Sequence, residues 1–170
     1  MWKLIKPEEI KDNVFQAIGK DWMLITAGTE EKANAMTASW GGMGILWRKP
    51  VVTAYIRPQR FTKGLVDAQD TFTLSFYEEA YRKSLNYMGT VSGAQEDKIA
   101  GGGLTLKLFD GVPAFEESRM VLVCKKLYTQ ELKEECFLYP ELIEQNYAQK
   151  DFHTMYIGEV MQVYVKESDK

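Results

Sequence analysis

The sequence predicts a mainly β protein with short helices, folded as an antiparallel β-barrel with helical insertions. About seven segments alternate in polarity or are rich in β-branched residues, which is typical of strands. Short helical segments separate some of them, but their order is not the βαβ repeat of a parallel sheet. With 170 residues, 45% of them hydrophobic, the chain can form one full core. We therefore expect a single domain over residues 1–170.

Composition argues against several classes of partner. The net charge of −3 gives no strong field for nucleic acid or for an acidic membrane. No apolar run approaches the ~20 residues of a membrane span, and the N-terminal residues lack the apolar stretch of a secretory signal. Cys124 and Cys136 are too far apart for a metal or CxxC motif, so free thiols in a reducing cytoplasm are expected.

The first part of the chain predicts a helix followed by a hairpin. Apolar residues at helical spacing predict a helix over 7–18 that ends at Gly19. The strand 22–27 and the turn 28–31 lead into a second strand within 32–44, and the two strands should pair as a hairpin.

The remaining elements alternate between strands and short helices. Further strands are expected at 50–56, 71–76, 104–108, 120–128 and 151–165. Further helices are expected at 63–68, 78–87, 94–99 and 140–149. The segment 130–135 is interpreted as a strand continuation or an exposed crossing, and 167–170 as a polar tail.

The segment 32–44 is unusually poor in large side chains. A core strand normally carries branched aliphatic residues, whereas here small residues predominate and allow a close approach to the backbone. An extended backbone places Thr37 and Ser39 on one face and Met36, Ala38 and Trp40 on the other. We interpret the segment as a strand whose N–H groups meet a flat ligand ring.

The residues Asn34-Ala35-Met36-Thr37-Ala38-Ser39-Trp40 resemble the start of the flavin-binding segment in flavin reductase-like, FMN-binding split-barrel proteins, which include flavoredoxin. Three later motifs fit the same resemblance, and together they span roughly residues 20–165. The resemblance implies a split β-barrel in which the segment from Asn34 to Trp40 contacts the flavin ring.

The second motif, Arg57–Gly64, follows a predicted strand. Thr62 can cap the helix that starts at Lys63, and a helix start with cationic side chains is suited to phosphate. In the resembling family this segment holds the FMN phosphate, which implies Arg57, Arg60, Thr62 and Lys63 here. The alternative is a turn with solvated arginines.

The third motif, Met88–Lys98, resembles the family's Gly-x-x-Ser-Gly…Asp-Lys stretch. The resemblance implies that this loop lies over the cofactor, with Ser92, Gly93 and Lys98 near it. The alternative is an ordinary loop in which Ser92 caps the helix 94–99.

The fourth motif, Asp151–Val160, resembles the family's late strand and contains His153, the one histidine of the chain. One histidine and two distant cysteines are too few for zinc, so no metal is expected. A Ser-His-Asp triad would lack its Gly-x-Ser-x-Gly elbow. His153 is therefore either a structural hydrogen-bonding residue or a group near the flavin that donates a proton at neutral pH.

The resemblance implies an oxidoreductase that passes electrons from NADH or NADPH through bound FMN to a flavin, a small molecule or a protein acceptor. FAD is a possible substitute for FMN, and the lack of a GxGxxG motif excludes a Rossmann nucleotide site. The family also implies a homodimer with the flavin near the interface. Two alternatives stay open: a non-catalytic FMN-binding electron carrier or planar-ligand-binding barrel, and a structural domain with an empty pocket.

Overall fold

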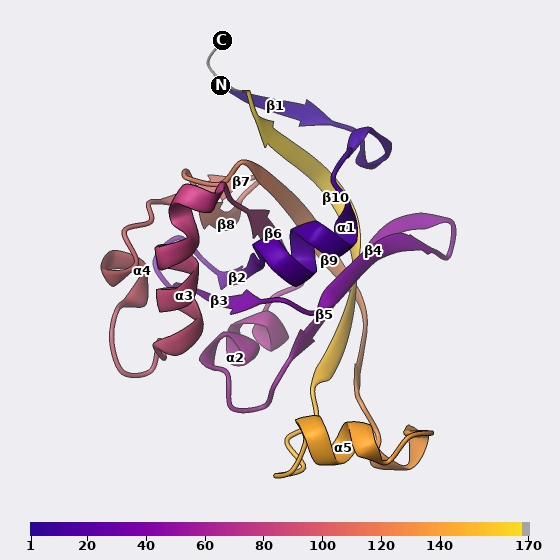
Figure 1. Cartoon of the computed structure of the whole chain (residues 1–170). Helices are drawn as coiled ribbons and strands as arrows, with labels where there is room; N and C mark the ends of the chain where they lie inside the picture. Colours follow the sequence, from indigo (N-terminus) through magenta and orange to yellow (C-terminus); the bar gives the residue numbers. More distant parts are fainter. Residues whose placement is uncertain (168–170) are drawn as a thin grey trace.

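The computed structural model describes residues 1–167, and it is dominated by strands (Figure 1). The strands are β1 (Trp2–Ile5), β2 (Met23–Gly28), β3 (Ala33–Ala38), β4 (Gly41–Leu46), β5 (Lys49–Ile56), β6 (Thr71–Phe76), β7 (Leu106–Phe109), β8 (Val112–Phe115), β9 (Met120–Glu131) and β10 (Thr154–Lys166). The α-helices are α1 (Val14–Gln16), α2 (Phe61–Ala68), α3 (Arg82–Thr90), α4 (Lys98–Gly101) and α5 (Glu141–Asn146).

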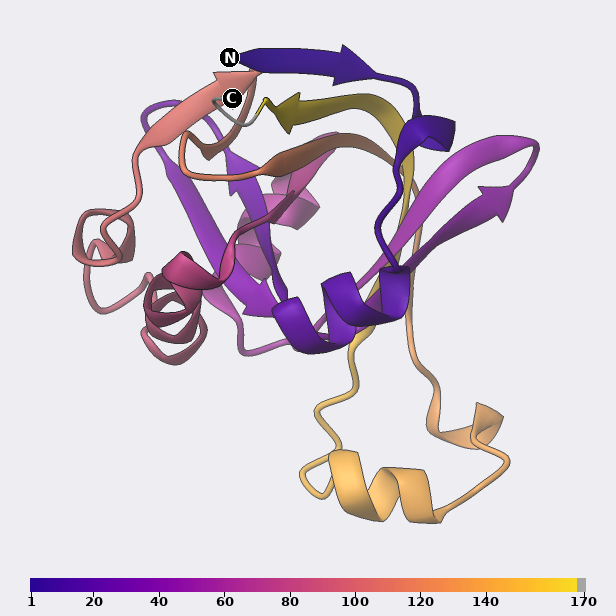
Figure 2. The same ribbon diagram turned by 45° about the horizontal axis from the view of Figure 1, so that its top comes forward.

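The main sheet is antiparallel throughout the described residues. Its order is β3-β2-β6-β9-β10-β5-β4, with β1 added to β10, while β7 and β8 form a separate hairpin. Figure 2 shows that the sheet curls round on itself, with α3 and α4 beside it. The predicted mainly β, antiparallel architecture with short helices is confirmed.

The core lies between the curled strands. Side chains of β2, β6 and β9 fill it, and Ile25, Phe72, Leu74 and Leu122 are fully buried. The alternation in β6 predicted one buried face, but both faces are covered. The second face packs beneath the β7–β8 hairpin, where the Thr73 hydroxyl donates to the Pro113 carbonyl at 2.7 Å. The hairpin strand β8 was not predicted.

The N-terminal region differs from the expected continuous helix over 7–18. A single 3-10 turn (Pro7–Glu9) is followed by a break, and Asn13 then starts α1 by accepting from the backbone N–H of Phe15 and Gln16. The helix does not end at Gly19, because a π-helical turn continues over Ala17–Asp21. Strand β1 was missed, since its stabilisation comes from pairing with β10 at the far end of the chain.

The small-residue segment 32–44 forms two strands rather than one. β3 pairs with β2 in the predicted hairpin. β4 begins after Trp40 and pairs with β5 instead. A Cβ atom at Gly41 would lie 2.8 Å from the Thr53 carbonyl oxygen of β5. The glycine there therefore permits close strand pairing, so this part of the segment serves the sheet.

Two segments project from the barrel (Figures 1 and 2). One is the β4–β5 hairpin, whose turn residues Trp47 and Arg48 both have positive φ, as a two-residue type I′ turn requires. The other, here called the arm, comprises residues 132–153 between β9 and β10 and contains α5. The segment 130–135 thus contains the end of β9 and the start of the arm.

Within residues 1–167, no helix is long and apolar enough to cross a membrane.

The remaining differences concern element boundaries. Predicted helices 63–68, 78–87 and 140–149 correspond to α2, to a 3-10 turn plus α3, and to the shorter α5. The predicted strand 104–108 starts later, at Leu106. In the predicted tail, Glu167 donates its N–H to the Met1 carbonyl, and residues 168–170 lie outside the described part of the chain.

Candidate functional site

An open cleft of about 230 Å³ forms where the ends of β3 and β5 meet the start of β10. Its lining is Met36, Thr37, Ala38, Ser39, Trp40, Tyr55, Arg57, Arg60 and His153. Five of these belong to the predicted ring-binding segment, and the other four come from distant parts of the chain. The fold therefore brings the first, second and fourth sequence motifs to one place.

The ring-binding segment is fixed to α3. The Thr37 hydroxyl donates to the Leu85 carbonyl at 2.5 Å, and a Cβ atom at Gly89 would lie 3.1 Å from Thr37 Cβ. At the end of the segment, the Trp40 indole lies against the His153 imidazole with ring centroids 5.1 Å apart. The cleft consequently has a β-strand on one side and an aromatic wall on another.

A second pocket of about 200 Å³ adjoins the cleft at Arg60. Its lining is Gln59, Arg60, Phe61, Thr62, Thr90, Val91, Ser92, Gly93 and Lys98. It joins the second motif to the third. Arg60 and Thr62, which were expected at the phosphate, share this pocket with Ser92, Gly93 and Lys98, which were expected in the loop over the cofactor. Each cavity is smaller than the roughly 300–1,000 Å³ of typical ligand pockets, but the two meet at Arg60.

The second pocket is strongly cationic. Lys98 is 3% exposed, and its Nζ donates to the carbonyls of Met88 (3.0 Å) and Val91 (3.1 Å). Arg60 Nη1 donates to the Gly89 carbonyl at 3.1 Å. Both side chains therefore satisfy carbonyls at the C-terminal end of α3, where the helix dipole favours positive charge.

Those carbonyls do not neutralise the two cations. Burial lowers the pKa of Lys98 to about 8, with a further contribution from the charge of Arg60. The pocket lining, as the described residues form it, has no carboxylate. Arg60 Nη2 is buried and has no hydrogen-bond partner among these residues. A buried donor without an acceptor is costly, so the pocket is suited to an anion.

Thr62 does not cap α2 as predicted. The helix begins two residues earlier, at Phe61, with Arg60 at the N-cap position and no side-chain cap. Thr62 is buried inside the first turn, and its hydroxyl accepts from Asn34 Nδ2 at 3.0 Å. Asn34 in turn packs beneath Gly93, where a Cβ atom would lie 2.6 Å from Asn34 Oδ1. Asn34 thus supports the wall of the second pocket instead of lining the cleft.

Ser92 also has a different local role from the predicted helix cap. Its hydroxyl accepts from the Ala94 N–H at 3.2 Å within a turn, and the helix predicted at 94–99 is replaced by α4. The cap of α4 is Asp97, which accepts from the Ala100 N–H. Lys98 is therefore the first helical residue, and its side chain points back toward α3.

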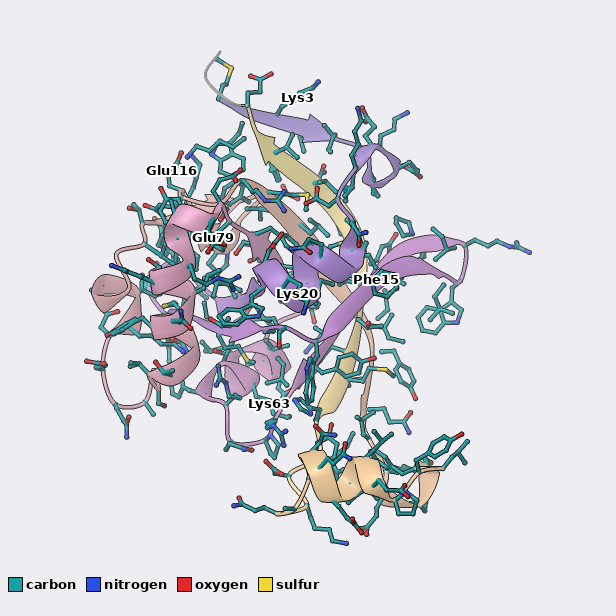
Figure 3. The ribbon with its side chains drawn as sticks, in the orientation of Figure 1. Lys3, Phe15, Lys20, Lys63, Glu79 and Glu116 are labelled. Carbon is teal, nitrogen blue, oxygen red and sulfur yellow. The ribbon has the colours of Figure 1, made fainter. Side chains whose placement is uncertain are left out.

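Arg57 lines the cleft, but its guanidinium holds the arm. Nη1 donates to Asp151 Oδ2 at 2.9 Å, and Nη2 donates to the Asn146 carbonyl at 3.0 Å. Gln59 also donates to Asp151, and its hydrogen bond is the main reason why the pKa of that carboxyl is lowered. The other predicted cation, Lys63, projects from α2 and pairs with Asp67 at 2.7 Å (Figure 3). Lys63 lines neither cavity.

His153 is 7% exposed and forms part of the cleft wall. Its Nδ1 lies 2.7 Å from the Tyr147 hydroxyl. Burial, with the nearby charge of Arg57, lowers the pKa of His153 to about 4, against the weaker opposing effect of Asp151. The imidazole is therefore neutral at pH 7, which favours the structural, hydrogen-bonding interpretation of His153 over that of a proton donor.

Sequence reasoning missed Tyr55 and Tyr147. Tyr55 lies near the end of β5, and Arg57 directly follows this strand. The alternation of an extended backbone places the two side chains on the same face, so the sequence could have indicated Tyr55 as a neighbour of Arg57. Tyr147 has no comparable signal, because the fold of the arm brings it to His153. No cluster of three or more metal-ligating side chains occurs in residues 1–167.

Comparisons with known proteins agree with this geometry. Residues 15–170 match the family model described as the flavin reductase like domain. A comparison with curated proteins found no match.

Several solved structures share the fold. An FMN-binding domain of a flavin reductases-like enzyme from Shewanella baltica OS155 has 16% identity and a TM-score of 0.71, covering 97% of this chain and 77% of that one. An FMN-binding protein from Thermus thermophilus with bound p-hydroxybenzaldehyde has 21% identity and a TM-score of 0.70, covering 98% and 83%. A flavoredoxin from Methanosarcina acetivorans has 20% identity and a TM-score of 0.69, covering 96% and 77%. The predicted split-barrel fold is confirmed.

The low pKa of His153 predicts a specific pH dependence of stability. Between its folded value of about 4 and the ordinary unfolded value near 6.5, the unfolded chain binds a proton that the native state does not. The free energy of unfolding should therefore fall as pH drops through this range, by at most about 1.4 kcal/mol per pH unit from this group. Urea unfolding of the wild type and His153→Asn at pH 4–7 measures the effect. Asparagine retains an acceptor for Tyr147, and a wild-type-minus-variant difference that is constant with pH would contradict the assignment.

Proposed function

This chain belongs to the flavin reductase-like family, and from this premise we propose that it binds FMN and acts as an oxidoreductase of the flavin reductase type. The observation that carries the proposal is the junction at Arg60 between a strand-lined aromatic cleft and a buried cationic pocket. One side of this junction suits a flat ring, and the other suits a phosphate. FMN has both groups in one molecule.

The chain's own residues fit the phosphate at the second pocket. Arg60 supplies the buried Nη2 that lacks a partner, and Lys98 supplies a second positive charge. Ser92 and the loop around Gly93 add hydroxyl and backbone groups. We assign Arg57 to anchoring the arm and not to the phosphate, because both of its terminal nitrogens already donate to Asp151 and Asn146.

The ring would lie in the cleft against the segment from Met36 to Trp40. Backbone N–H groups of this segment are fixed dipoles there, which tune a bound redox group without adding a net charge. FMN, when bound, would supply two-electron chemistry between NADH or NADPH and an acceptor. The open side of the cleft leaves room for the nicotinamide without a Rossmann unit.

For the electron acceptor we propose a flavin, a protein or a small conjugated carbonyl compound. The Thermus thermophilus neighbour with bound p-hydroxybenzaldehyde supports the last class. A non-catalytic FMN-binding electron carrier is the alternative function, and the structural likeness to a flavoredoxin supports it. FAD is a less suitable cofactor, since carboxylates of Glu30, Glu31, Glu96 and Asp97 line the cavity that continues outward from the phosphate pocket.

We further propose that two copies of the chain form a homodimer. Large apolar residues are exposed on the β4–β5 hairpin, where Ile45 is 74% and Trp47 53% exposed. Phe15 projects from α1 and is also exposed (Figure 3). A reducing cytoplasm is the proposed location, consistent with the free thiols of Cys124 and Cys136.

If Arg60 binds the phosphate, its substitution should weaken the binding of FMN but not that of riboflavin, which has no phosphate. Arg60→Ala should weaken FMN binding by about 10- to 100-fold, the range for roughly 1.5–3 kcal/mol of a charged hydrogen bond, and should leave riboflavin binding nearly unchanged. Fluorescence titration with both flavins measures the ratio. Lys63→Ala is the matched control and should keep the wild-type ratio, as should Arg57→Ala. Equal losses for FMN and riboflavin in Arg60→Ala would refute the site.

The reductase function predicts a spectral change. The purified protein, supplied with FMN, should show flavin absorbance that bleaches when NADH or NADPH is added without oxygen. Bleaching by dithionite but by neither nicotinamide would favour the electron carrier. A preparation that retains no FMN would reject both functions.

The dimer predicts that one charge at the hairpin is enough to separate the copies. Ile45→Lys should shift the mass found by sedimentation equilibrium from two chains to one, because the introduced charge would be buried in the interface. Lys3→Ala serves as the control on an exposed strand. A wild-type protein that sediments as one chain at all concentrations would contradict the dimer.

A further inference from the structure

The Tyr147 hydroxyl lies behind His153, on the side away from the cleft. Its oxygen is 2.7 Å from His153 Nδ1, and both side chains are buried, at 5% and 7% exposed. His153 lines the cleft and Tyr147 does not. Since Nδ1 is engaged with Tyr147, Nε2 is the ring nitrogen left for a ligand in the cleft.

The direction of this hydrogen bond decides the tautomer of the imidazole. A neutral imidazole has one N–H and one acceptor nitrogen. Within residues 1–167, Nδ1 is the acceptor at hydrogen-bond distance from the Tyr147 hydroxyl. If Nδ1 carried the proton, the Tyr147 O–H would be left without an acceptor in a buried place, which is costly. Tyr147 must therefore donate, and the imidazole proton is on Nε2.

Both residues are in the right charge state for this arrangement. Burial raises the pKa of Tyr147, against smaller opposing effects of Arg57 and of a hydrogen bond from the backbone of His153. The phenol therefore stays protonated at neutral pH, and the imidazole stays neutral.

The position of Tyr147 is fixed by its neighbours. The Arg57 guanidinium lies over its ring, 5.0 Å from the centroid, and also donates to the adjacent Asn146 carbonyl. Phe152 packs against the same ring with centroids 4.9 Å apart, and Phe137 packs at 5.9 Å. Arg57 thereby connects β5, which borders the cleft, to the segment of the arm that holds Tyr147.

We propose that Tyr147 is a positioning residue that locks His153 as a neutral Nε2–H donor facing the cleft, where it binds the carbonyl oxygen of a flat, conjugated substrate. The part that concerns the substrate rests on the proposed function. The Trp40 indole, 5.1 Å from the imidazole, supplies a flat apolar surface beside the donor. An uncharged donor next to an aromatic wall suits an aldehyde, enone or quinone better than an anionic acceptor.

The single histidine of the chain makes the tautomer directly measurable. Long-range ¹H–¹⁵N NMR of the full chain at pH 7 should give one imidazole signal pair, with Nε2 protonated and Nδ1 unprotonated. Tyr147→Phe, which keeps the ring and its packing, should give a mixture of tautomers. Tyr139→Phe is the control, because Tyr139 is on the same arm but 68% exposed, and should leave the spectrum unchanged. A wild-type spectrum with protonated Nδ1, or one that Tyr147→Phe does not alter, would overturn the lock.

Ligand binding tests the direction of the donor. In the FMN-loaded protein, Tyr147→Phe should weaken p-hydroxybenzaldehyde by about 3- to 10-fold, as expected for one neutral hydrogen bond, and should leave p-cresol, which lacks the carbonyl, unchanged. Equal weakening of both probes, or a parallel loss of FMN affinity, would overturn the role in carbonyl binding. The NMR measurement needs no FMN, so a protein without flavin would defeat the proposed function and still leave the tautomer lock testable.

Discussion

The placement of buried Lys98 and half-buried Arg60 beside the C-terminal end of α3 is the constraint on which the site depends. Arg60 and Lys98 come from different motifs, and each donates to carbonyls of the last helical turn or the residue beyond it. The helix end holds both side chains in place, but burial and, to a smaller extent, the charge of Arg60 still lower the pKa of Lys98. An anion in the adjoining pocket would offset these charges, so local stability and ligand binding share the same residues.

The curled sheet brings the rest of the site to this helix end. β3 is tied to α3 through Thr37, and β5 delivers Arg57 and then Arg60 at the start of α2. The arm closes the opposite side of the cleft, because Arg57 holds it through Asp151 and Asn146. The cleft thus has a strand on one side and the arm on another, and Arg57 and Gln59 tie the arm to the segment after β5. Such an arrangement suits a cofactor that stays bound against β3 and a substrate that exchanges beside the arm.

The groups around His153 determine its charge state and its tautomer. A histidine near neutral pH is commonly a proton donor and acceptor, but burial beside Arg57 keeps this one neutral. The hydrogen bond with Tyr147 then determines which nitrogen faces the cleft. The resulting neutral group is suited to binding and orienting a ligand.

The sequence by itself determined the mainly β class, most strand positions and the residue types at the site. Alternation and β-branched runs are local signals, and the motifs around Asn34, Arg60 and Lys98 are contiguous in the chain. Tertiary structure alone decided that Gly41 serves strand pairing, that Thr62 supports a wall, and that Arg57 holds the arm. It also decided that Tyr147 reaches His153. These roles depend on partners that are far away along the chain. The sequence around a cation or a glycine looks the same whether its partner is a ligand, a carboxylate or a neighbouring strand.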